Sequence, residues 1–126
     1  MRVLVIPPAA QRDEESIQML SAWIAENGLH CTLNVGMWRE TGIDEPAAWG
    51  KLLADVARHI GGALKEQTGA NAVAVVDSIV RSFLDELGEP TTDAQGGFHG
   101  VLPWVEVATL WSADRPNYGD TVLDGA

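Results

Sequence analysis

Residues 29–38 read LHCTLNVGMW, and their alternation makes them the clearest strand in the chain. Apolar side chains occupy every second position, which is typical of a strand with one face on a core. The other face is largely polar, and its tryptophan indicates an interface, where this residue is enriched. We expect four residues of that face to meet water or a partner: His30, Thr32, Asn34 and Trp38.

Three helices are predicted around this strand. Residues 13–27 begin with three acids, which suit the positive end of a helix dipole, and carry an apolar stripe at helical spacing. A second helix starts near residue 46 and ends at residue 69. Gly61 and Gly62 interrupt it, and they mark either a kink or the close approach of another backbone. A third helix covers residues 70–87, and the short turn before it favours an antiparallel hairpin.

The rest of the chain carries weaker patterns. Residues 3–6 are a short apolar run, stopped by two prolines, and residues 104–111 have strand-like content. We therefore predict an α+β fold, with three helices packed on one face of a small two- to three-stranded sheet. Residues 1–92 form one domain in this prediction. Residues 93–126 form a C-terminal extension, with a possible extra strand followed by a flexible acidic tail.

Composition limits the possible partners. The chain has 126 residues and a formal net charge of −10. Eight acids and one base fall in residues 82–126. Such a chain is a poor match for nucleic acid or an anionic membrane, both of which attract positive surfaces. No stretch approaches the length of a membrane span, and the apolar run at the N-terminus is too short for a signal peptide. We expect a cytoplasmic protein that binds neither nucleic acid nor membrane.

The small number of strands predicts an assembly. Isolated strand pairs are marginally stable, and an open strand edge must be paired or covered. Pairing the strand at residues 29–38 with its copy in a second subunit would meet this need with two-fold symmetry. We therefore predict a homodimer.

Few side chains suggest catalysis or metal binding. Asp55 and His59 lie four residues apart on a predicted helix, and with His30 they are weak candidates for a zinc or iron site. Surface pairing of Asp55 with a neighbouring base is the simpler interpretation, so we expect no metal and no cofactor. The one cysteine, Cys31, belongs to the apolar set of its strand and is interpreted as a small buried hydrophobe rather than a nucleophile.

Three motifs carry a resemblance to a known family: IPPAAQRD at residues 6–13, the strand at 29–38, and WGKLLADVARH at 49–59. Together they are similar to a family of short bacterial proteins, best represented in proteobacteria, that is known only as a domain of unknown function. The resemblance covers roughly residues 6–90 and implies no catalytic residues. It directs attention to the polar members of the matching stretches: Gln11, Arg12, Asp55, Arg58 and His59. These residues either mark a ligand site or form a buried polar tie between the N-terminal arm and the long helix.

A non-catalytic interaction or accessory module, acting as a homodimer with a possible protein partner, is the function that we expect. An enzymatic role is less favoured. One alternative is a small-molecule or metal-binding protein, possibly an enzyme, that uses Arg12, His30, Asp55, Arg58 and His59. Another is an acidic inhibitor or nucleic-acid mimic.

Overall fold

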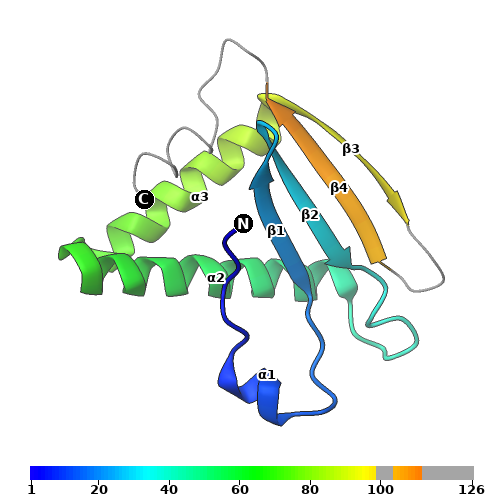
Figure 1. Cartoon of the computed structure of the whole chain (residues 1–126). Coiled ribbons are helices and arrows are strands. Elements are labelled where there is room, and N and C mark those ends of the chain that lie inside the picture. The colour runs from blue at the N-terminus through cyan, green and yellow to red at the C-terminus, as the bar shows by residue number, and fades with distance from the viewer. Residues whose placement is uncertain (99–103, 112–126) are drawn as a thin grey trace.

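The structure is a computed structural model that describes residues 1–98 and 104–111 (Figure 1). It confirms the α+β class. Four antiparallel strands form one sheet in the order β1-β2-β4-β3, and two long helices form a hairpin beside it. The elements, in chain order, are α1 (Pro8–Arg12), β1 (Leu20–Ala25), β2 (Gly28–Asn34), α2 (Glu45–Thr68), α3 (Ala72–Gly88), β3 (Thr92–Phe98) and β4 (Trp104–Trp111).

The prediction of a helix over residues 13–27 is wrong. Its second half is β1, which pairs with β2 from Ala25 opposite Gly28 onward. The two residues between the strands, Glu26 and Asn27, have φ angles of 49° and 58°. Positive φ at both positions is the geometry of a type I′ turn, which matches the twist of paired strands. Asn27 therefore belongs to a hairpin turn, and Gly28 begins β2 and does not end a helix.

Strand β2 is internal to the sheet, with β1 on one side and β4 on the other. It ends at Asn34, four residues earlier than predicted. Because both of its edges are paired, it is not available for pairing with a second copy, and that route to a homodimer is wrong. The segment beyond residue 92, treated above as an extension, contributes β4 and most of β3 to this sheet. The predicted tail lies outside the described residues from 112 onward.

The helix hairpin agrees with prediction. Its packing explains why one of the two adjacent positions in α2 requires a glycine. A Cβ atom added at Gly61 would lie 3.0 Å from the carbonyl oxygen of Ala72 and 3.0 Å from Cγ2 of Val76. Gly61 is thus the point where α2 and α3 approach closely, whereas Gly62 faces open space. Asn71 caps α3 by accepting a hydrogen bond from the amide of Ala74 at 3.0 Å. From the turn the two helices diverge (Figure 1).

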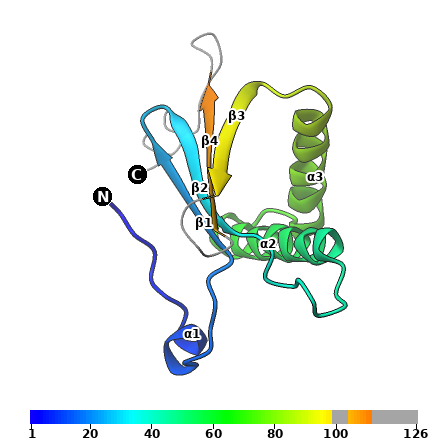
Figure 2. The same cartoon turned by 90° about the vertical axis from the view of Figure 1, so that its right-hand side faces the viewer.

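The backbones of the sheet and the helix hairpin stand apart within the described ranges. There α2 contacts α3 and each strand contacts its neighbours, but no Cα atom of either long helix lies within 8 Å of a strand Cα atom. The hairpin stands beside the sheet (Figure 2). No apolar side chain of residues 1–97, the part whose side chains are described, is fully buried. Within these residues of a single copy, the predicted packing of helices on one sheet face is therefore not seen.

Many large apolar side chains are exposed instead. They occur in the N-terminal arm, on β1, in the loop before α2 and along both long helices. Those more than two fifths exposed include Val3, Leu4, Val5, Ile6, Ile17, Ile43, Leu53, Val56, Ile60, Val73, Val80, Phe83, Leu84 and Leu87. No described helix is both long and apolar enough to cross a membrane.

Candidate functional site at the junction of sheet and hairpin

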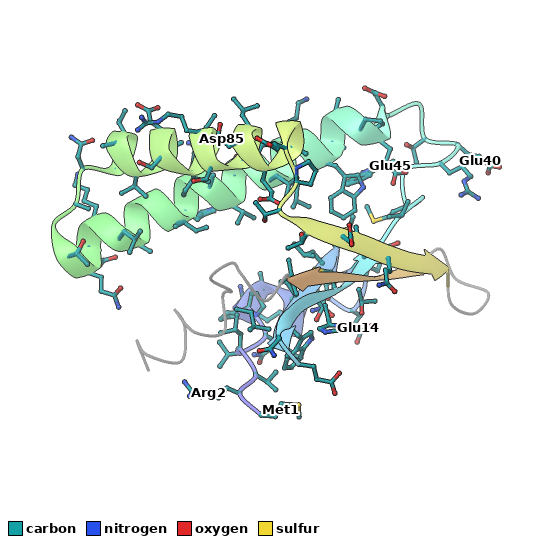
Figure 3. The ribbon with its side chains drawn as sticks, turned by 90° about the horizontal axis from the view of Figure 1, so that it is seen from above. Met1, Arg2, Glu14, Glu40, Glu45 and Asp85 are labelled. Atoms are coloured by element: carbon teal, nitrogen blue, oxygen red, sulfur yellow. The ribbon has the colours of Figure 1, made fainter. Side chains whose placement is uncertain are left out.

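One carboxylate fixes the junction between the sheet and the hairpin. Glu45 begins α2, and its Oε2 accepts a hydrogen bond from the amide of Gly36 at 2.8 Å (Figure 3). The same oxygen accepts one from Nε1 of Trp49, one turn along the helix, at 3.2 Å. Hydrogen bonds to a charged acceptor contribute about 1.5–3 kcal/mol each when partly buried. Glu45 therefore ties the end of β2 to the start of the hairpin.

Two tryptophans reinforce this tie. The rings of Trp38 and Trp49 meet edge to face, with centroids 6.2 Å apart and planes at 89°. This geometry is favoured by the ring quadrupoles and contributes about 0.5–1.5 kcal/mol beyond area burial. Both side chains are only half-buried. The pair therefore packs the loop against α2, and part of each ring stays exposed.

The tryptophans line an open hollow of about 690 Å³. Its walls are mainly apolar, and Arg39 and Glu40 add charge. The remaining lining residues include Leu33, Val35, Ile43 and Pro46. A hollow with these walls suits an apolar or aromatic group better than an ion. Glu45 already serves two donors, so its role here is positional.

The strand register sorts the side chains of β1, β2 and β3 into two faces. Paired residues in an antiparallel sheet share a face. One face carries apolar and small residues: Leu20, Ala22, Ile24, Leu29, Cys31, Leu33, Ala94 and Gly96. The opposite face carries Ser21, Trp23, His30, Thr32, Asn34, Asp93 and Gln95. Burial raises the pKa of the Cys31 thiol, which keeps it protonated and apolar.

The four candidate interface residues do not form one surface. His30 and Thr32 lie on the polar face of β2, and the imidazole Nε2 of His30 lies 3.1 Å from the carbonyl oxygen of Ala25. Asn34 is buried, and its backbone N–H donates to the carbonyl oxygen of Met19 at 3.0 Å. Trp38 lies past the strand, in the turn that leads to the hollow. Their role as an interface stays a prediction.

The five polar residues of the family motifs are all exposed in this chain, and they fall into two separate groups. Gln11 donates from Nε2 to the carbonyl of Ile6 at 2.7 Å, which fixes the short α1 helix. On α2, Arg58 donates to Asp55 at 3.2 Å in a solvent-exposed ion pair. Among the described elements, α1 does not contact α2, so one copy does not bring the groups together. Their role as a ligand site or polar tie stays a prediction.

The weak metal candidates are also spread out. His30 lies in the sheet, whereas Asp55 and His59 lie on α2, and these elements do not touch within the described residues. Among residues 1–97, whose side chains the structure describes, no three potential metal-binding side chains gather.

Sequence reasoning missed Glu45 and the hollow. The available signal was a glutamate directly before a helix-starting proline, with a tryptophan four residues later on the same helix face. That spacing predicts a Glu45–Trp49 contact. The second partner of Glu45 is the backbone amide of Gly36. That contact depends on the path of the loop between them, which no sequence pattern predicts.

Comparison with known proteins places the chain in a family and supports the fold. Residues 3–91 match the family model described as "Domain of unknown function (DUF5076)". No curated protein matches the chain. A solved structure from the photosynthetic bacterium Rhodopseudomonas palustrus CGA009, provisionally named a pyruvate dehydrogenase, is 25% identical with a TM-score of 0.58. The match covers 79% of this chain and 97% of that one.

Proposed function

We propose that this chain, which belongs to the DUF5076 family, acts in the cytoplasm as a small non-catalytic interaction module that folds only as a homodimer. The observation that carries the proposal is the missing core in residues 1–97, the part whose side chains the structure describes: no apolar side chain there is fully buried. Burial of apolar surface is the main driving force of folding, so this chain needs surface from another molecule.

The exposed apolar side chains support the same proposal. Sixteen large apolar residues of the described part are 40% or more exposed, among them Leu4 at 93%, Val73 at 71% and Leu87 at 66%. Apolar surface left open on this scale marks a site of contact with another molecule. A second copy is the natural source of cover because it is always present in equal amount and closes by two-fold symmetry.

The mass of the purified protein tests the proposal. Light scattering after size exclusion, at about ten micromolar, should give twice the 13.5 kDa of one chain. A folded monomer, shown by a cooperative melting transition at single-chain mass, would refute it.

Native mass spectrometry on the same sample separates this proposal from its main alternative. A dimer with no additional mass supports an interaction module. Retained metal or metabolite would instead favour a small-molecule or metal-binding protein, and Arg58 and His59 would be the first residues to change.

A further inference from the structure

The apolar side chains in the C-terminal part of α3 are not covered by α2. The packed part lies near the turn, around Gly61 and Val76. Farther along α3, every residue from 80 to 88 is exposed, and we call residues 80–88 the open limb. Three of the large apolar residues on this open limb recur at helical spacing along α3: Val80, Phe83 and Leu87, at 44%, 48% and 66% exposure.

The apolar face of the sheet has a complementary shape. Ala22 lies opposite Cys31, and the same row continues through Val107 of β4 to Gly96 of β3. On β1 and β2 the small pair Ala22 and Cys31 lies between two larger pairs, Leu20 with Leu33 and Ile24 with Leu29. The face therefore has a shallow trough at Ala22 and Cys31, where a large side chain from another element fits. Alternation of large and small residues across two layers is how native cores reach their packing density.

Within one copy the two surfaces do not meet, because the hairpin and the sheet make no contact in the described residues. Glu45 and the tryptophan pair hold the start of α2 in this arrangement. Two other dimers are less consistent with these surfaces. Stacking sheet on sheet leaves the open limb of α3 uncovered in both copies, whereas joining hairpin to hairpin leaves both apolar sheet faces uncovered.

Resting on the proposed homodimer, we infer that two copies exchange their hairpins, so that the open limb of α3 in each copy packs on the apolar sheet face of the other. The exchange covers both surfaces in both copies with one repeated contact. It also gives the α+β layering, helices on one sheet face, that a single copy lacks.

Cysteine cross-linking tests the mode of assembly, since Cys31 is the one cysteine of the chain and marks the trough. Wild-type protein is mixed with a Cys31→Ala variant that also carries Val80→Cys, Phe83→Cys or Leu87→Cys. The mixture is unfolded, refolded together so that heterodimers form, and oxidised. The matched control carries Asp85→Cys, two residues from Phe83 and on the opposite side of α3.

Exchange predicts a covalent heterodimer between wild type and at least one of the three stripe variants, with the control at least tenfold lower. Each protein oxidised alone should stay uncross-linked. Cross-linking of wild type with itself would instead show sheet stacking, and cross-linking of a stripe variant with itself would show hairpin pairing. Either result, or no heterodimer from any stripe variant, overturns the exchange.

Light scattering of the same samples before oxidation separates the two proposals. Dimer mass with a wrong or missing cross-link overturns the exchange and leaves the homodimer standing. Folded monomer mass overturns both.

Discussion

At the residue scale, the turn between β1 and β2 holds a side chain in a costly backbone conformation. Glu26 has a φ of 49°, and a left-handed conformation costs a non-glycine residue roughly 1–2 kcal/mol. Asparagine tolerates this region far better. We therefore expect Glu26→Asn to raise the free energy of unfolding by about 1 kcal/mol, measured by urea titration at fixed protein concentration.

The matched control for that change is Glu89→Asn. It removes the same charge and adds the same amide at a position where φ is −143°. The backbone there is not left-handed, so asparagine relieves no strain relative to glutamate. A gain of equal size in both variants would trace the effect to net charge and contradict the turn explanation.

At the scale of single elements, the sequence predicted the helices and strands whose apolar residues recur with a clear local period. The hairpin of α2 and α3 and the strand β2 follow from apolar spacing alone. Strand β1 was missed because Leu20, Trp23 and Ile24 fit a helical stripe as well as a strand. The deciding feature was the two-residue turn at Glu26 and Asn27, whereas the sequence Asn27-Gly28 fits a helix end equally well.

The junction of α2 and α3 gives the second test, because two adjacent glycines differ only in surroundings. Gly61→Ala places a Cβ atom 3.0 Å from the backbone oxygen of Ala72, so the helices must shift apart. Overpacking costs about 1–3 kcal/mol, which exceeds the roughly 1 kcal/mol that alanine gains in a helix. We expect net destabilisation of up to about 2 kcal/mol. Gly62→Ala meets no atom within 4 Å and should instead stabilise by up to about 1 kcal/mol. Urea titration of both variants should show opposite signs, and equal signs would contradict the close approach.

At the scale of the whole molecule, the sequence could not show which surfaces meet. Alternation in β2 predicted one core-facing side, and the register shows an apolar face there. The covering layer, however, is not found among the described residues of the same copy. An apolar stripe specifies that a face is buried, but it carries no information on whether the cover comes from the same chain or from another. The candidate polar residues on α1 and α2 lie apart within one copy. A single copy therefore does not show whether a second copy brings them together.

A chain whose residues 1–97 bury no apolar side chain fully should show folding coupled to association. The equilibrium between a native dimer and two unfolded chains depends on concentration, so a tenfold rise in protein adds about 1.4 kcal/mol per dimer. With a urea dependence of about 2–3 kcal/mol/M, the unfolding midpoint should rise by about 0.5 M for each tenfold step. Far-ultraviolet circular dichroism from one to a hundred micromolar measures this directly. The two helices and the sheet should melt in one transition, because the contact between copies holds both. A midpoint independent of concentration would mean that each chain completes its core alone, through contacts that the described residues do not make.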